Sequence, residues 1–297
     1  MGTSRISKLV EQSPCGGQTM NDFAGKRGRA WFHALTGQSR PMEGDPASVL
    51  VADADLGGNR ARFLCVVPNP GGRFPCARHG EVGLEEAWTL AARVHEITRP
   101  NGSGAKQPIV ALVDLKSQAY GRREEIAAIY LAAAGAADAY GTARLAGHPV
   151  ISLVVGQALS GGFLTHGYQA NRILAFDDAG VMIHAMHKAA AARVTRRSVK
   201  DLEALASKIA PMSYDIRDFA KLGLLHKLLH PTNPDLPTRE DVAMVQAELI
   251  AAIEDARATP VDLRNRRESK EAEATRRASR LVYQKLSEQW HGPSGKI

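Results

Sequence analysis

Two continuous apolar runs stand out in the chain, at residues 109–115 (IVALVDL) and 149–155 (PVISLVV). Runs of this length, rich in β-branched residues and bounded by Pro or Gly, are typical of strands buried on both faces of a sheet. A turn and a helix are predicted after each run, at residues 116–121 and 122–140 and at residues 156–162 and 163–170. Repeated strand–turn–helix units predict an α/β fold whose active loops lie at the carboxyl ends of the strands.

Shorter periodic segments surround these two units. Residues 49–54 and 61–67 are predicted as strands, because the sequence DLGGN between them is a turn sequence. Residues 82–97 place apolar side chains on one stripe, which predicts an amphipathic helix. Further along, the pattern predicts two short strands within residues 171–186, helices at 199–209 and 216–221, and a strand at 223–229.

These elements divide the chain into three parts. Residues 1–45, rich in Gly, Ser and Arg, predict a flexible N-terminal lead with one short helix within residues 20–36. Residues 46–230 are predicted as the main domain. Residues 231–297 predict a basic, helical C-terminal extension, because three prolines mark a linker and Thr238 then caps a helix that runs to about residue 257.

Composition and charge narrow the class of protein. The chain is 44% apolar and 23% charged, and it contains no apolar run of the roughly 20 residues that a membrane helix needs. Its first residues lack the apolar core of a signal peptide, so we expect a cytoplasmic protein that does not bind a membrane. The net charge of +7 is concentrated in residues 257–285, where a solvated helix face is favoured over nucleic-acid binding, because no aromatic platform accompanies it.

The turn between the second strand and its helix, GQALSGG at residues 156–162, carries the clearest chemical signal. Backbone N–H groups at the start of a helix have no intrahelical acceptor and favour an anion or a developing oxyanion. A dinucleotide site is not indicated, because the Gly-x-Gly at residues 102–104 precedes a strand instead of following one, and no Walker A sequence is present. The three cysteines form no Cys-x-x-Cys pair, so we expect no metal site.

Three segments carry a resemblance to a known family: GQALSGGFLTHG, NRILAFDDAGVMIHAM and MSYDIRDFAKLGLLHKLL. They resemble the core of the ClpP/crotonase superfamily, and within it they are most similar to the gamma subunit family of malonate decarboxylase. The segments at residues 49–88, 117–125 and 187–198 match this family as well. The resemblance covers roughly residues 20–257 and leaves the two ends of the chain unassigned.

The resemblance implies a crotonase-like core of repeated ββα units with trailing C-terminal helices. It also implies a biotin-independent malonate decarboxylase of malonate catabolism, in which this chain and a beta subunit of similar fold form a composite site in a hetero-oligomer. That site converts malonyl-S-acyl carrier protein to acetyl-S-acyl carrier protein. This chain would bind no cofactor of its own, since the thioester is carried on the coenzyme-A-derived prosthetic group of the acyl carrier protein.

Site residues are assigned by the same resemblance. The amides of Gly161 and Gly162 correspond to the superfamily's oxyanion hole, with Ser160 leading into them. The candidates for substrate binding are Gln118, Ala119, Tyr120, Gly121 and Gln157. The broader carboxyltransferases often have Asp-x-Pro-Gly after the first strand, whereas here Asp114 is followed by Leu-Lys-Ser, which leaves the role of the 118–121 turn open.

Two alternatives remain at this stage. Ser160 and His184 stand where the Clp protease subunit has its catalytic serine and histidine, which would make the chain a serine hydrolase. No acid falls at that family's spacing, so a Ser160–His184 hydrogen bond that shapes the decarboxylase site is favoured, and His184 can equally be a core histidine. As a non-catalytic scaffold, the chain would instead use its basic face to bind an acidic carrier protein.

Overall fold

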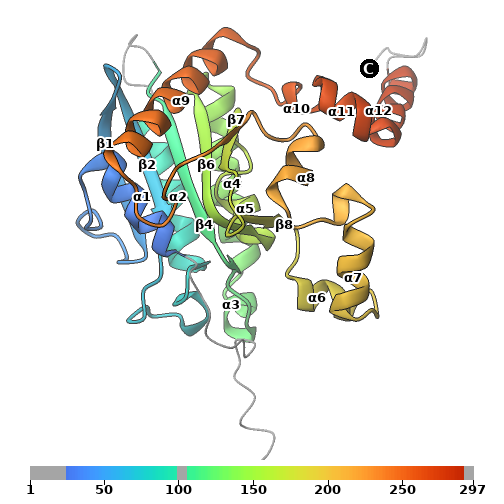
Figure 1. Cartoon of the computed structure of the whole chain (residues 1–297). Helices are drawn as coiled ribbons and strands as arrows, with labels where there is room; N and C mark the ends of the chain where they lie inside the picture. Colours follow the sequence, from blue (N-terminus) through green and yellow to red (C-terminus); the bar gives the residue numbers. More distant parts are fainter. Residues whose placement is uncertain (1–24, 99–105, 291–297) are drawn as a thin grey trace, which may run out of the picture.

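A mixed β-sheet forms the centre of the molecule in the computed structural model, which describes residues 25–98 and 106–290. Its strands follow the order β1-β2-β4-β6-β7-β9, and β8 pairs with the far end of β6 (Figure 1). Only β1 and β2 are antiparallel within this described sheet. The strands are β1 Val49–Leu56, β2 Asn59–Val66, β4 Ile109–Leu115, β6 Val150–Leu159, β7 Arg172–Phe176, β8 Met182–His184 and β9 Lys227–Leu229. A parallel pair, β3 Glu81–Val82 and β5 Ser117–Gln118, lies beside it.

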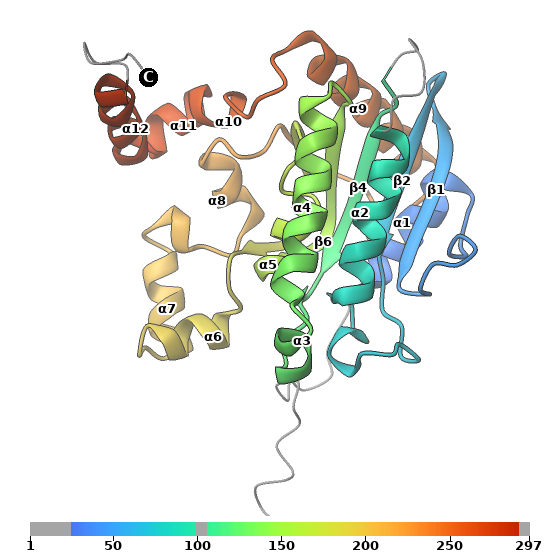
Figure 2. The ribbon, with the colours of Figure 1, turned by 180° about the vertical axis from the view of Figure 1, so that it is seen from behind.

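Helices cover both faces of the sheet. Helices α2 (Leu84–Thr98) and α4 (Ile129–Leu145) pack side by side on one face (Figure 2), and α1 (Lys26–Thr36) and α9 (Arg239–Ala258) lie on the other (Figure 1). Every residue of β4 is buried, as its continuous apolar run predicts. In α1, Trp31 and Phe32 are fully buried in the same core, and Trp31 packs edge-on against Phe176 of β7.

Two predicted boundaries near the glycine-rich turn are wrong. Residues 156–159 continue β6, and the helix that follows, α5, spans only Ser160–Thr165 instead of 163–170. The cause is a change of neighbour along β6: residues 151–154 pair with β7, and residues 157–159 pair with β8 instead. On the other side of β6 the register with β4 shifts between Val113 and Leu115, and Leu115 still pairs with Ala158. The predicted helix 122–140 is also divided, into α3 (Arg122–Ile126) and α4, by Ala128 with a φ of 62°.

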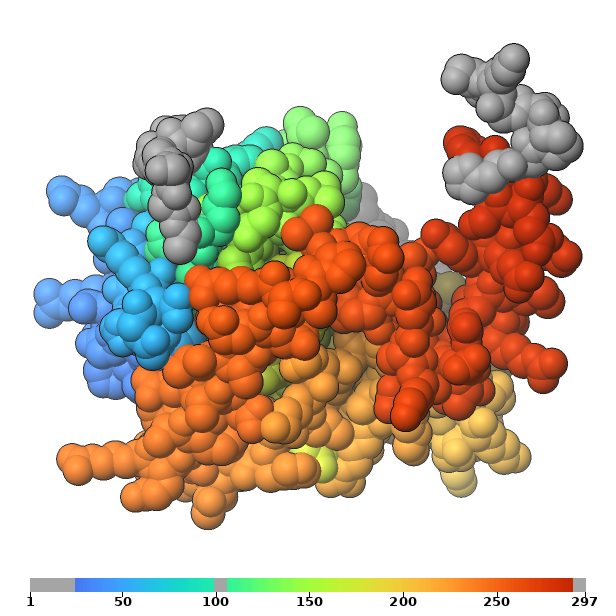
Figure 3. All heavy atoms as spheres, turned by 90° about the horizontal axis from the view of Figure 1, so that it is seen from above, coloured from blue at the N-terminus to red at the C-terminus, as the bar shows by residue number. Residues whose placement is uncertain are grey.

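The remaining helices follow β8 in the chain. They are α6 Lys188–Val194, α7 Val199–Ala206, α8 Ile216–Lys221, α10 Asn265–Glu268, α11 Lys270–Thr275 and α12 Arg277–Trp290, with short 3₁₀ turns at Pro75–Ala77 and Ala210–Met212. Seen from above, residues near the C-terminal end stand out at one side of the molecule (Figure 3). None of the helices in the described ranges combines the length and apolar composition that a membrane span needs.

Candidate active site

The candidate site is built where β6 ends and α5 begins. Leu159 is extended, with φ −112°, and Ser160 then turns into the left-handed region with φ 60°. Gly161 and Gly162 follow in the first turn of α5, where backbone N–H groups have no intrahelical acceptor. A non-glycine residue in the left-handed region is uncommon, and such residues cluster at functional sites.

The turn after β4 forms the opposite wall. A β-carbon on Gly162 would lie 2.5 Å from the carbonyl oxygen of Ser117, and one on Gly161 would lie 2.7 Å from Oε1 of Gln118. Position 162 therefore requires glycine, because a side chain there would clash with the backbone of Ser117, which cannot move aside as a flexible side chain could. The structure thus brings together the two turns that the sequence places in the site.

The residues of this second turn have different environments. Oε1 of Gln118 is buried and has no hydrogen-bond partner among the described residues. Ala119 is fully buried and its N–H donates to the carbonyl of Val82, so its side chain belongs to the core. Gly121 leads into α3, where a β-carbon would meet the Glu124 carboxylate.

Tyr120 contacts Ser160 directly. Its hydroxyl lies 2.5 Å from Ser160 Oγ, and either oxygen can donate. Ser160 is 5% exposed whereas Tyr120 is 49% exposed. A half-exposed phenol is therefore held beside the Gly161–Gly162 amides. The sequence placed both residues in the site but gave no indication of this pairing.

Asp114 is a buried carboxylate that the sequence suggested only as a departure from a motif. It accepts hydrogen bonds from the N–H groups of Gln157 and Gly28, each at 3.1 Å, and a β-carbon on Gly156 would clash with it. Burial raises the pKa of this carboxyl. Asp114 thus lies where the register between β4 and β6 shifts, and it holds the backbone of Gln157 in place. The sequence feature that could have indicated this role is an acidic residue inside an otherwise apolar strand.

Ser160 bonds to Tyr120, and His184 bonds to the backbone of Met186, so the predicted Ser160–His184 hydrogen bond is wrong. Nδ1 of His184 lies 2.9 Å from the carbonyl oxygen of Met186 and 3.1 Å from its backbone nitrogen, and the ring stacks on Tyr214 at 4.1 Å. Burial lowers the pKa of His184, which favours the neutral ring. The register aligns His184 with Leu159, while the left-handed turn directs Ser160 towards Tyr120.

Comparison with known proteins identifies the family. The profile of the malonate decarboxylase gamma subunit family matches residues 77–290, most of the chain. The chain belongs to this family. It is 53% identical to a chain of a Pseudomonas malonate decarboxylase hetero-tetramer in complex with coenzyme A, with a TM-score of 0.83 over 87% of this chain and 99% of that one. It is 52% identical to a chain of the Pseudomonas MdcD-MdcE hetero-dimer, with a TM-score of 0.82 over 89% and 99%.

More distant relatives share the fold or part of the sequence of this gamma-family chain. A transcarboxylase 12S structure has the same fold, with a TM-score of 0.59 at 18% identity over 86% of this chain and 45% of that one, so the predicted crotonase-like fold is confirmed. The malonyl-S-ACP:biotin-protein carboxyltransferase MADD of Malonomonas rubra is 35% identical over 162 residues. That match spans 53% of this chain and about half, 55%, of the relative.

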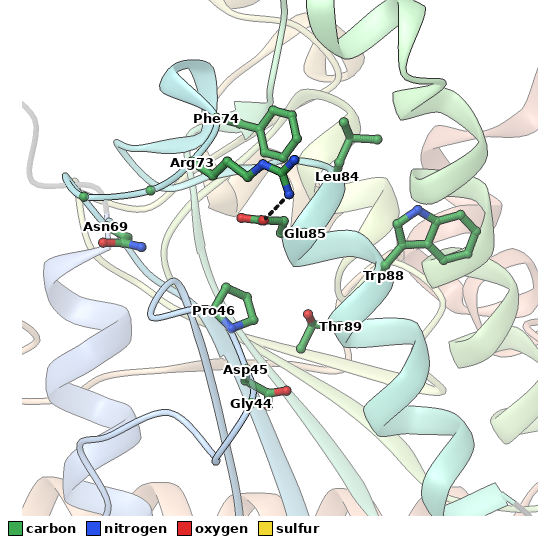
Figure 4. A pocket seen from close by; sticks show the side chains of 12 residues that line it. Gly44, Asp45, Pro46, Asn69, Arg73, Phe74, Leu84, Glu85, Trp88 and Thr89 are labelled. Atoms are coloured by element: carbon green, nitrogen blue, oxygen red, sulfur yellow. Dashed lines mark ion pairs between the residues drawn. The ribbon is translucent and has the colours of Figure 1, made fainter.

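Two cavities of this gamma-family chain lie away from the Gly161–Gly162 turn. One of about 620 Å³ lies between two loops and α2, where Arg73 and Glu85 approach to 3.9 Å and Trp88 stands at the edge (Figure 4). Another of about 700 Å³ lies among α10, α11 and α12. Neither is lined by a residue that the sequence placed in the site. Within residues 25–98 and 106–290, no three His, Cys, Asp or Glu side chains gather as metal ligands would.

Proposed function

We propose that this chain acts as the gamma subunit of a malonate decarboxylase and, with a beta subunit of the same fold, converts malonyl-S-acyl carrier protein to acetyl-S-acyl carrier protein. The main support for this proposal is the close packing of the Gly161–Gly162 turn on the 117–121 turn. This packing occurs in a chain that is 53% identical to a malonate decarboxylase chain. The relative from Malonomonas rubra acts on malonyl-S-ACP, which supports a carrier-bound thioester.

The chemistry requires stabilisation of developing negative charge. When the bond between the carboxylate and C2 breaks, its electron pair moves into the thioester and forms an enolate. Fixed N–H donors aimed at the enolate oxygen lower this barrier and need no reorganisation during the reaction. The Gly161 and Gly162 amides are donors of this kind, because glycine lets Ser117 approach and hold the turn in place.

The exposure of Tyr120 supports a composite site. Tyr120 is half-exposed at the edge of the turn, and the two cavities described above lie elsewhere. We therefore infer that the beta subunit supplies the wall that excludes water from the malonyl carboxylate. The thioester would be carried on the prosthetic group of the carrier protein, and the chain would need no cofactor of its own. We place this assembly in the cytoplasm.

A serine hydrolase is not favoured. The general base of such an enzyme must reach the serine hydroxyl, and His184 is instead held by Met186 and Tyr214. The non-catalytic scaffold remains distinguishable by experiment, because it predicts that the Gly161–Gly162 turn has no kinetic role.

Reconstitution tests the proposal. Co-purified with a beta subunit, the complex should decarboxylate malonyl thioester, whereas this chain alone should be inactive. Gly162→Val should lower kcat by about 10²–10³-fold by misaiming an oxyanion donor, with a smaller change in KM. Gly141→Val is the matched control, because the nearest atom to a β-carbon on Gly141 of α4 is 3.9 Å away.

Two results would contradict this proposal. Substantial turnover by the isolated chain would argue against the composite site. An unchanged kcat for a folded Gly162→Val complex would favour the scaffold. Carrier binding by that variant, measured in parallel, separates loss of chemistry from loss of the partner.

A further inference from the structure

The hydroxyl of Tyr120 is the feature of the site that oxyanion stabilisation leaves without a role. Loss of CO2 leaves an enolate, and C2 of that enolate must take up a proton before acetyl thioester can leave. Backbone amides stabilise the oxygen but cannot supply this proton. A side chain with a transferable proton is needed within reach of C2.

We propose that Tyr120 is the catalytic acid that protonates C2 of the enolate, an inference that rests on the proposed decarboxylase function. Its hydroxyl is fixed 2.5 Å from Oγ of Ser160, the residue directly before the Gly161 amide. The proton donor is thus held next to the groups assigned to the enolate oxygen. In an enolate, C2 is separated from that oxygen by one carbon. Groups on this turn can therefore stabilise the oxygen and protonate C2 of the same intermediate.

Other polar side chains near the turn are less suited to the task. Nδ1 of His184 is bonded to the backbone of Met186, and its ring is stacked on Tyr214. Nε2 of His187 lies 2.7 Å from the carbonyl of Lys116, so that nitrogen is committed to the backbone. Gln118 lies on Gly161, but an amide does not act as an acid. Tyr120 combines an acidic O–H, a fixed position and access to solvent.

The proposed step needs water as its only other reactant. The bond between C2 and the carboxylate breaks, its electron pair forms the enolate, and CO2 leaves. The O–H bond of Tyr120 then breaks as the C=C electron pair of the enolate forms the new C2–H bond, which leaves Tyr120 as a phenolate. A water molecule returns a proton to the phenolate from the solvent side, since Tyr120 is 49% exposed, and hydroxide is released to solvent. A phenol is a far stronger acid than the C–H of a thioester, so this transfer is downhill.

Labelled CO2 tests the assignment in the reconstituted complex. In the wild type the enolate is protonated before CO2 returns, so little labelled CO2 should enter the unreacted malonyl thioester. In Tyr120→Phe, acetyl thioester formation should fall by about 10²-fold, the usual contribution of general acid catalysis. Incorporation of label per turnover should rise, because the unprotonated enolate captures CO2 again. Tyr130→Phe, on the exposed surface of α4, should change neither rate.

Two outcomes for Tyr120→Phe would contradict the assignment. A parallel fall of turnover and label incorporation would mean that Tyr120 has only a structural role, and unchanged turnover would mean that another group donates the proton. Ser160→Ala should reduce turnover by less than about tenfold, because Ser160 only positions Tyr120 and a lost neutral hydrogen bond contributes about 1 kcal/mol. Failure of the decarboxylase proposal looks different: the wild-type complex would then release no CO2 from malonyl thioester.

Discussion

Ser160 combines an unfavourable backbone conformation with a short hydrogen bond. Its φ of 60° lies in the left-handed region, where a side chain raises the conformational free energy by roughly 1–3 kcal/mol. The bond to Tyr120 and the packing of Gly162 on Ser117 hold it there. Glycine at position 160 would relieve the strain but would also release Tyr120. The strain is therefore stored where the proposed proton donor is positioned.

His166, six residues further on, is a fully buried imidazole that burial holds neutral. Nε2 lies 3.1 Å from the carbonyl of Leu112 and Nδ1 lies 2.8 Å from the hydroxyl of Tyr140. A carbonyl can only accept, so we infer that Nε2–H donates to Leu112 and that Nδ1 accepts from Tyr140. Burial lowers the pKa of His166 to about 4, whereas an exposed histidine has a pKa of about 6.5.

Acid should therefore destabilise the fold between about pH 6.5 and the pKa of about 4. In this window the unfolded chain binds a proton at His166 and the folded chain does not, so the free energy of unfolding falls as the pH falls, by about 3 kcal/mol in total. Denaturant titrations of the wild type and His166→Gln from pH 7 to pH 4 measure this. The variant should be less stable at pH 7 but should lose less stability on acidification. Equal pH dependence in both proteins would contradict the assignment.

At the residue scale, the sequence predicted which residues form the site better than it predicted their partners. GQALSGG indicated Gly161 and Gly162 because a strand, glycines and a helix start are local features. The partner of Ser160 is Tyr120, which lies 40 residues earlier in the chain, in the turn after β4. Sequence patterns do not show which side chain of that turn lies beside Ser160. The Ser160–His184 bond was wrong for the same reason: proximity of strands does not fix the direction of side chains.

At the scale of elements, α9 begins with a capping box that also holds the preceding linker. Thr238 Oγ1 accepts from the N–H of Asp241 at 3.1 Å. The Asp241 carboxylate accepts from the N–H groups of Thr232, Asn233 and Thr238 at 2.6, 3.1 and 3.3 Å, and these bonds lower the pKa of Asp241 against the opposing effect of burial. One side chain thus satisfies three donors at the helix start.

Removing the two halves of this box should have unequal effects. Thr238→Ala should lower the free energy of unfolding by about 1 kcal/mol, the usual contribution of an N-cap. Asp241→Ala should lower it by about 2–3 kcal/mol, because three N–H groups lose their acceptor. Ser198→Ala, in the exposed capping box of α7, is the control and should cost less than either. Urea unfolding measures all three, and equal losses for Thr238→Ala and Asp241→Ala would contradict the role given to the carboxylate.

Elements whose ends are set by local pattern were predicted closely. Strand β4 and helix α8 have the predicted bounds, because apolar runs and caps define them. The extension of β6 to Leu159 was not predictable, since it depends on strands distant in the sequence. β8 follows β7 as the neighbour of β6, and Leu115 of β4 pairs with Ala158 after the register shift. Helix α6, in the Ala-rich segment after His187, was missed because it lacks an apolar stripe and a side-chain cap.

At the scale of the whole molecule, two arginines connect the C-terminal segment to the sheet domain. Arg266 of α10 is 5% exposed, donates to the carbonyls of Tyr168 and Ala170, and lies over the Tyr168 ring at 5.2 Å. Burial lowers the pKa of Arg266 to about 10. From the sheet domain, Arg144 of α4 donates to the carbonyl of Val261. The chain beyond α9 is thus held by charged side chains bonded to backbone carbonyls.

Arg266→Ala should loosen residues 265–290 while leaving the sheet intact. Its charged hydrogen bonds and its packing on Tyr168 should contribute about 2 kcal/mol after the cost of burial, so the open state of this segment should become about 30-fold more populated. Hydrogen exchange measured by mass spectrometry should show faster exchange in α11 and α12 with β4 and β6 unchanged. Arg264→Ala is the matched control, because Arg264 is paired with Asp262 in the same segment and should alter exchange little. Unchanged protection of α11 in Arg266→Ala would mean that its packing on α8 holds the segment without the arginine.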